Sequence, residues 1–302
     1  MSLDYYHRRK VHLNGWEYLL DDEERTAWIA KGKIKRVRRY RIPTSVVIEG
    51  KEYRIESVEM GAFRHTKTLR HLVIPDGIQY VDEYNFSFSK SLRSIYIGKD
   101  VDYISSWLFH NNPNLRTFVI SPDNPHLFME DGIVYSKDGT VALCAIFQPR
   151  HLHIREGVTL IENVAFWWNP RLEQVDFPAS LRKIGDNSFA GCPRLKSIVL
   201  PEGFEECVVQ SFEENKGLES VDLPSTMSML QWDTFLDCPN LHTMRIRTKD
   251  VLPIDLYSEY DKDEFDKMVS QYDIFVPSHL IDAYRHHPYW GKCRSINSLD
   301  AH

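Results

Sequence analysis

Side chains that could take part in catalysis lie between residues 144 and 176. Cys144 could supply a thiolate nucleophile, His151 and His153 could act as bases, and Asp176 could orient a histidine. Such a set would make a cysteine-dependent hydrolase. Nothing in the sequence fixes the geometry that this chemistry requires, so the residues favour a non-enzymatic protein. The two histidines could also ligate a metal, but no third ligand is evident, and we predict no metal and no cofactor.

Another set of side chains suits ligand binding. Histidine, tyrosine and arginine recur at positions that we expect to face away from the core, where exposed aromatic groups often mark contact surfaces. Trp167 and Trp168 are adjacent, and two neighbouring indoles rarely both face inward, so we expect one to be exposed or covered by an inserted hairpin, with coverage favoured. The alternative interpretation is an ordinary solvated surface. The candidate ligand-binding residues are His71, Arg93, Tyr96, Arg116, His151, His153, Trp167 and Trp168.

A repeated unit must position these side chains. Three 23-residue units follow one another from Leu172 to Leu241, and each opens with Leu, has apolar residues three and five positions later, then Pro, and has Phe at position seventeen. Self-similarity at a fixed period is the signature of a solenoid, in which each small unit stacks on the next. The same frame extends through most of the chain. Units begin at Val46, Leu69, Leu92, Leu115, Pro149, Leu172, Leu195, Leu218 and Leu241.

The spacing within a unit predicts which side chains are buried. Apolar residues three and five positions after the start point to one side of a strand, and the following Pro ends the strand because it lacks a ladder donor. Residues two and four positions after the start then face outward on a sheet. Arg70, Arg93, Arg116 and Arg150 form a stripe along its edge that could grip an anionic or carbohydrate ligand. The outward pairs include His71/Val73, Ser94/Tyr96, Thr117/Val119, His151/His153, Gln174/Asp176, Ser197/Val199, Ser220/Asp222 and Thr243/Arg245.

A column of small polar residues lies three positions before each unit. Asn tolerates tight turns and bonds neighbouring backbone, and a small thiol packs inward, so we expect this column to satisfy turn amides from one unit to the next. Its cysteines are two units apart, roughly 10 Å, which is too far for a disulfide. The column consists of Asn112, Asn169, Cys192, Asn215 and Cys238.

The segments LRKIGDNSFAGCPRL at 181–195 and ESVEMGAF at 56–63 resemble leucine-rich repeats of the BspA type. The resemblance implies an α/β-type repeat solenoid, a right-handed leucine-rich repeat arc of about nine short strands with an inserted β-hairpin and capping elements at both ends. It further implies a bacterial surface or secreted protein that binds host proteins or carbohydrates. The family has no catalytic motif that could be transferred to this chain.

The frame divides the chain into five segments. Residues 1–45 hold a capping hairpin, formed by 16–20 and 26–30, and a basic linker, 31–41. The linker is either an anion-binding strip or a solvated strand packed through Ile34, Val37 and Tyr40.

An Asp138-Gly139 turn predicts the inserted hairpin. Helices are expected at 263–271 and, capped by Ser278, at 278–285. The segments are 1–45 as the cap and linker, 46–120 and 149–246 as repeats, 121–148 as the inserted hairpin, and 247–302 as the C-terminal cap.

Composition excludes several classes of protein. The chain has 302 residues, 42% hydrophobic content and a net charge of −6, which argues for a folded core and against a general nucleic-acid binder. No apolar run approaches the roughly 20 residues that span a bilayer. The start of the chain lacks the apolar stretch of a signal peptide, so we expect either a cytoplasmic protein or a surface protein whose leader was removed.

Together these features predict a non-enzymatic binding or adhesion scaffold that presents its exposed sheet to a protein or carbohydrate ligand. A structural protein that self-associates through the repeat array is the alternative.

Overall fold

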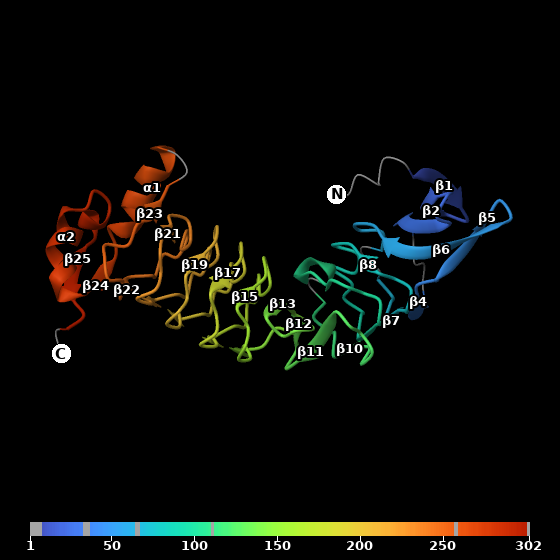
Figure 1. Cartoon of the computed structure of the whole chain (residues 1–302), viewed down its shortest axis with the longest axis horizontal. Helices are drawn as coiled ribbons and strands as arrows, with labels where there is room; N and C mark the ends of the chain where they lie inside the picture. Colours follow the sequence, from blue (N-terminus) through green and yellow to red (C-terminus); the bar gives the residue numbers. More distant parts are fainter. Residues whose placement is uncertain (1–7, 33–36, 64–66, 110–111, 257–258, 301–302) are drawn as a thin grey trace. The chain divides into compact units, whose positions relative to one another are not determined.

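The computed structural model describes residues 8–32, 37–63, 67–109, 112–256 and 259–300, and the chain divides into two compact units (Figure 1). The first unit comprises Met1–Lys137 with Cys144–Phe147, and the second comprises Asp138–Leu143 with Gln148–His302. The fold is a β-solenoid of about ten turns with little helix, which confirms the predicted repeat solenoid. Within the described residues, no helix is both long and apolar enough to cross a bilayer.

One sheet of the first unit is made of parallel strands, one from each successive turn. Residues that occupy the same position in the 23-residue unit lie side by side, as with Leu72 beside Ile95 and Ile95 beside Phe118. These three side chains are buried, because residues in register on neighbouring parallel strands point to the same face of the sheet. The sheet order is β10-β9-β7-β4, with β4 at Arg39–Arg41, β7 at His71–Ile74, β9 at Ser94–Ile97 and β10 at Thr117–Ile120.

The hairpin predicted near the N-terminus is present. Strands β2 (Trp16–Asp21) and β3 (Thr26–Lys31) pair in antiparallel fashion, and β1 (Arg9–Leu13), which the sequence did not reveal, pairs with β2. Strand β3 also pairs in parallel with β6 (Lys51–Val58), which pairs with β5 (Ser45–Ile48) and with β8 (Tyr80–Val81). The hairpin therefore continues the hydrogen-bond ladder of the first repeat turns.

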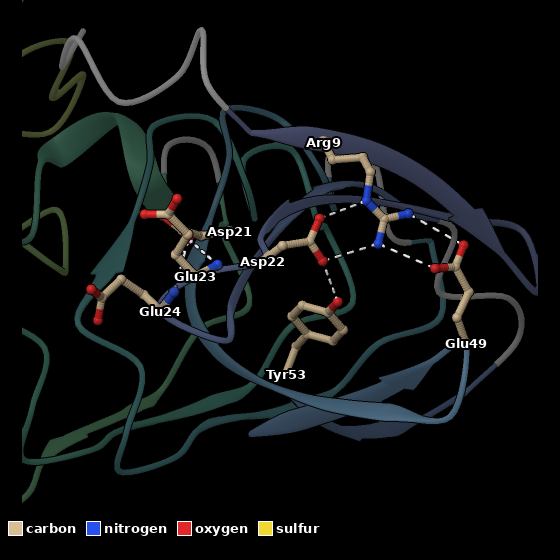
Figure 2. A network of polar contacts seen from close by, with 7 residues as sticks. All are labelled: Arg9, Asp21, Asp22, Glu23, Glu24, Glu49 and Tyr53. Carbon is tan, nitrogen blue, oxygen red and sulfur yellow. Dashed lines mark hydrogen bonds and ion pairs between the residues drawn. The ribbon is translucent and has the colours of Figure 1, made fainter.

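Polar side chains tie the hairpin to the β5–β6 turn (Figure 2). The Arg9 guanidinium donates to both carboxylate oxygens of Asp22 at 2.8 and 3.1 Å and pairs with Glu49 at 3.2 Å. The Tyr53 hydroxyl donates to Asp22, and Asp21 accepts the backbone N–H groups of two turn residues. Arg9 thus links the first strand to both turns.

We expect replacement of Asp22 by asparagine to weaken the pH dependence of stability. Hydrogen bonds from Arg9 and then Tyr53 hold the pKa of Asp22 well below its usual range, outweighing the opposing effect of desolvation. A carboxyl with a lowered folded-state pKa stabilises the folded state above its unfolded pKa of about 4, and that stabilisation is lost as the pH falls. Melting temperatures measured from pH 7 to pH 2 should therefore fall less steeply for Asp22→Asn than for the wild type. Parallel curves would contradict this role of Asp22.

Both strands predicted around the Asp138-Gly139 turn form, as β12 (Ile133–Ser136) and β13 (Val141–Ala145). Asp138 Oδ1 accepts the Thr140 amide at 3.0 Å and the Thr140 hydroxyl at 2.8 Å, which stabilises the turn. An additional hairpin was missed. Strand β11 (Leu127–Glu130) pairs antiparallel with β12 across Asp131-Gly132, both of which have positive φ angles, as a tight two-residue turn requires.

The second unit repeats the parallel arrangement with two ladders of strands. The strands whose alternate side chains face outward are β14 (His151–His153), β16 (Gln174–Asp176), β18 (Ser197–Val199), β20 (Ser220–Leu223), β22 (Thr243–Ile246), β24 (Asp273–Val276) and β25 (Ser295–Ser298). A second ladder of two-residue strands forms where the sequence predicted only a reversal of the chain. It comprises β15 (Leu160–Ile161), β17 (Lys183–Ile184) and β19 (Glu206–Cys207), which pair in this order, and a separate pair, β21 (Leu230–Gln231) and β23 (Ile254–Asp255).

The phenylalanine of each turn stacks on the next within each unit. In the second unit Phe212 lies 5.4 Å from Phe189 and 5.7 Å from Phe235 between ring centroids, and all three rings are buried. Phe63 and Phe86 stack likewise in the first unit, at 5.4 Å. This aromatic column joins consecutive turns, as the spacing predicted.

The predicted polar column bonds the backbone of neighbouring turns. Asn215 is buried, and its Nδ2 donates to the carbonyls of Phe189 and Phe212 at 3.0 and 2.8 Å. Its Oδ1 accepts the amide of Cys192 at 2.8 Å. Cys238 Sγ lies 3.2 Å from the Phe212 carbonyl, so the thiols take part in the same column, and none of the five cysteines forms a disulfide.

The C-terminal segment contains helices α1 (Glu259–Val269) and α2 (Ile281–His286), and α1 begins four residues before the predicted start. The prediction that Ser278 caps a helix was wrong. Residues Ser278–Leu280 form a 3-10 turn without a side-chain cap, and the Ser278 amide donates to Asp300 instead. Trp290 is fully buried and its Nε1 donates to the Leu252 carbonyl at 2.8 Å, which ties the end of this segment to its beginning, next to β23.

Candidate ligand-binding surface

The outward face of β4, β7, β9 and β10 presents two rows of side chains in register. One row runs Arg39, His71, Ser94, Thr117, and the other runs Arg41, Val73, Tyr96, Val119. His71 Nδ1 lies 2.7 Å from the Ser94 hydroxyl, so neighbouring strands are linked on this face. His71 and Tyr96 are half-buried and Val119 is 42% exposed. The predicted outward positions of this unit are confirmed.

Four arginines line one edge of this face, and we call them the arginine ladder: Arg38, Arg70, Arg93 and Arg116. The Arg70 amide donates to the Arg38 carbonyl, the Arg93 amide to the Arg70 carbonyl and the Arg116 amide to the Arg93 carbonyl, at 2.8, 2.8 and 2.9 Å. Backbone pairing therefore places these residues side by side, each immediately before one of the consecutive strands β4, β7, β9 and β10. The Arg116 guanidinium also donates to the Pro113 and Leu115 carbonyls, so it has a structural role besides its charge.

The basic segment at residues 31–41 was interpreted either as an anion-binding strip or as a solvated strand, and its last three residues do form a strand. Residues Arg39–Arg41 form β4, which pairs with β7. Tyr40 supplies packing as expected, since its ring lies 5.6 Å from Phe63, whereas Val37 is 37% exposed. Ile34 lies outside the described residues. The sequence thus missed Arg38, Arg39 and Arg41 as part of the candidate surface.

His151, His153 and Asp176 cluster on the outward face of β14 and β16 in the second unit. His151 Nε2 lies 2.7 Å and His153 Nδ1 lies 3.5 Å from Asp176 Oδ2, and Gln174 Nε2 donates to Asp176 Oδ1 at 3.0 Å. Desolvation raises the pKa of Asp176, but the hydrogen bonds from Gln174, His151 and His153 together outweigh it and lower that pKa. The cluster is a solvated hydrogen-bonded patch, because the three side chains are 42–70% exposed.

The predicted site residues are divided between the two units. His71 and Tyr96 lie on a sheet of the first unit, with Arg93 and Arg116 at its edge, and His151 and His153 lie on a sheet of the second. Trp167 and Trp168 lie on neither sheet, because they follow the buried Phe166 in a turn.

One of the two tryptophans was expected to be exposed or covered by the inserted hairpin, and Trp168 is exposed, although coverage was favoured. Its side chain is 47% exposed, and it adopts a positive φ of 56°. The ring packs over Gly191, where an added Cβ would lie 2.7 Å from the indole. Trp167 is half-buried, with its ring centroid 5.3 Å from that of Trp168. One indole is therefore exposed, as the pairing of the two residues predicted.

Cys144 is poorly suited to nucleophilic chemistry. Its side chain is buried in β13, and burial raises the pKa of its thiol to about 12. A thiol with such a pKa forms almost no thiolate at neutral pH. In the part of the chain that the structure describes, no group of three or more His, Cys, Asp or Glu side chains is placed to hold a metal ion.

We expect the four buried cysteines to resist alkylation in the folded protein. Burial raises the pKa of all four thiols, and for Cys192 and Cys238 the value is also about 12. Iodoacetamide at pH 8 should label them about 100-fold or more slowly than the urea-unfolded chain, because only the thiolate reacts. Peptide mass spectrometry measures the rate at each site. Rapid labelling of Cys144 in the folded protein would instead indicate an activated nucleophile.

Comparison with protein families gives a match to the BspA type leucine rich repeat region, in six copies, over residues 44–128 and 146–260. The matched residues cover more than half of the chain and include β7, β9 and β10 of the first unit and the strands from β14 to β23 of the second. Comparison with curated protein sequences gives no significant match.

Solved structures similar to this chain include leucine-rich repeat proteins of two bacteria. One, from Eubacterium ventriosum, has 14% sequence identity and a TM-score of 0.51, and the alignment covers 78% of this chain and 77% of that protein. Another, from Bacteroides ovatus, has 18% identity and a TM-score of 0.50, with 96% of this chain and 76% of that protein covered. At these identities the similarity concerns the fold alone.

Proposed function

The chain belongs to the family of proteins with BspA-type leucine-rich repeats, and from this premise we propose that it is a non-enzymatic binding scaffold. Its ligand-binding surface is the outward face of β4, β7, β9 and β10 in the first unit. Exposed sheets of repeat proteins are their usual binding surfaces, because each turn adds side chains in register. The ligand is a protein or a carbohydrate.

The observation that carries this proposal is the composition of that face. His71 and Tyr96 stand on adjacent strands, and Tyr96 is flanked in its row by Val73 and Val119. Tyrosine offers a rigid apolar body with a polar tip, which suits both protein and sugar contacts. The outward residues of these four strands include no Asp or Glu. This face therefore combines aromatic, apolar and cationic groups without neutralising carboxylates in its strands.

Binding to a panel of immobilised proteins and glycans tests the proposal. We expect the wild-type chain to retain at least one component, and His71→Ala/Tyr96→Ala to lose roughly tenfold or more of its affinity for it. The double variant should keep the wild-type melting temperature within a few degrees, because its side chains contribute little to the core.

Two matched variants control for general effects on the surface. Ser197→Ala/Val199→Ala alters the equivalent positions of β18, where Val199 is 63% exposed, and should bind like the wild type. His151→Ala/His153→Ala removes the histidine patch of the second unit and should also bind normally. Unchanged binding by His71→Ala/Tyr96→Ala, or no retained component in the whole panel, would refute the proposed surface.

A further inference from the structure

The arginine ladder carries positive charge that no neighbouring carboxylate neutralises. Arg38, Arg93 and Arg116 are exposed and Arg70 is half-buried. Among the described residues, no Asp or Glu lies within ion-pair distance of these four guanidinium groups. Exposed lysines precede two of the rungs, at Lys67 and Lys90, and β4 adds Arg39 and Arg41. The first unit thus has a continuous basic edge beside its candidate binding face.

The equivalent positions of the second unit alternate between basic and acidic residues, which form ion pairs. They are Arg150, Glu173, Lys196, Glu219 and His242. Arg150 lies 3.6 Å from Glu173, and Lys196 lies 2.6 Å from Glu219. The hydrogen bond and charge of Lys196 lower the pKa of Glu219. The same fold position therefore holds self-neutralising ion pairs in one unit and cations alone in the other.

The acidic side chains of the repeats in the first unit are engaged elsewhere. Asp76 accepts the Lys99 amide at 2.9 Å, and Asp100 accepts the Gly77 amide at 2.8 Å, in the turns that follow the strands. These positions come six or seven residues after the ladder in each unit, about 20 Å along an extended chain. Their carboxylates thus stabilise turns and leave the ladder free to meet an external anion.

We propose that the arginine ladder binds a linear sulfated polysaccharide laid across the strands of the first unit. The inference rests on the proposed function and narrows its ligand. Parallel strands are about 4.8 Å apart, so four rungs present guanidinium groups along about 14 Å. Guanidinium groups bind sulfate and carboxylate oxygens through paired hydrogen bonds, which makes arginine a better match than lysine for such anions. A chain that carries anionic groups at intervals can therefore contact several rungs together.

The face suits a polysaccharide better than a nucleic acid. Single-stranded nucleic acids are bound by aromatic platforms on which successive bases stack, but the outward rows of β7, β9 and β10 contain one aromatic residue, Tyr96. The net charge of −6 also opposes general attraction of long polyanions, so binding must depend on the local ladder. Val73, Tyr96 and Val119 instead offer an apolar row parallel to the ladder, against which sugar rings can lie.

Titration of the full chain with heparin, with heparin stripped of its sulfates and with a dT oligonucleotide tests this inference. We expect heparin to bind at low ionic strength and to be released as added salt screens the contact. Arg38→Ser/Arg93→Ser should bind heparin at least tenfold more weakly with an unchanged melting temperature, because both side chains are exposed. The matched variant Arg150→Ser/Lys196→Ser, which loses the same charge from the second unit, should bind within about twofold of the wild type.

Each other outcome would overturn the inference. Absence of heparin binding, equal loss in Arg38→Ser/Arg93→Ser and Arg150→Ser/Lys196→Ser, equal affinity for desulfated heparin or tighter binding of the oligonucleotide would each exclude a sulfated polysaccharide on the ladder. The proposed function is judged separately by the panel. If a component is retained through His71 and Tyr96 while heparin is not bound, the ladder inference fails and the binding scaffold stands.

Discussion

Replacing Phe212 with alanine should destabilise the protein by about 3–5 kcal/mol, the usual cost of removing a buried aromatic ring. Phe212 is fully buried and lies between Phe189 and Phe235 in the aromatic column of the second unit. The substitution removes apolar burial and two ring contacts at once, and a turn held on both sides has little freedom to collapse into the space. Urea unfolding monitored by far-ultraviolet circular dichroism measures the loss.

Phe275→Ala provides the matched control for this prediction. Phe275 is a half-buried phenylalanine on the outward face of β24, with the Arg245 guanidinium 5.6 Å from its ring centroid. Its removal should cost about 1 kcal/mol or less, because it leaves no buried cavity. Similar losses for Phe212→Ala and Phe275→Ala would show that the aromatic column contributes nothing special to stability.

Replacing Asn215 with alanine should cost about 2–4 kcal/mol, although the residue touches no candidate ligand-binding group. The substitution removes partners from the carbonyls of Phe189 and Phe212 and from the amide of Cys192, all in a buried turn. A buried polar group without a partner costs more than the hydrogen bond itself contributes, because it has lost its water as well. Thermal and urea unfolding both measure this loss.

Asn240→Ala is the control for the asparagine column. The Asn240 side chain also donates to a backbone carbonyl of the preceding turn, that of Lys216 at 2.7 Å, but the bond is exposed. Water can replace this donor, so the expected cost is about 1 kcal/mol or less. If the two asparagine variants lose equal stability, burial of the column is irrelevant to its role.

Much of the repeat architecture could be predicted from the sequence because each turn must present the same chemistry to its neighbours. Phe212 and Asn215 recur in their columns for this reason, and alternation along the strands places His71 and Tyr96 on the outward face. The second ladder could not be predicted. Its two-residue strands, such as Lys183–Ile184, carry at most one buried side chain each and are too short to show an alternation of buried and exposed residues.

Physical reasons explain why some strands and turns were not predicted from the sequence. Arg39 pairs with His71 after an interval longer than the 23-residue period, so a frame that begins at Val46 leaves the first rung of the arginine ladder outside. The hairpin at Asp131-Gly132 has the same Asp-Gly dipeptide as the turn at Asp138-Gly139, but only the turn at Asp138-Gly139 was predicted. The sequence also did not predict that the arginines of the ladder form no ion pairs among the described residues of the first unit, while the charged residues of the second unit form ion pairs. The ion-pair partners of a side chain depend on which strands lie side by side.

Hydroxyl-radical footprinting of the full chain, with and without the panel component that it retains, locates the binding surface on the protein. The proposed binding face predicts that Tyr96 and His71 become protected when the component is bound, while His151, His153 and Trp168 react as in the free protein. Protection of the residues of the second unit, with Tyr96 and His71 unchanged, would contradict the account.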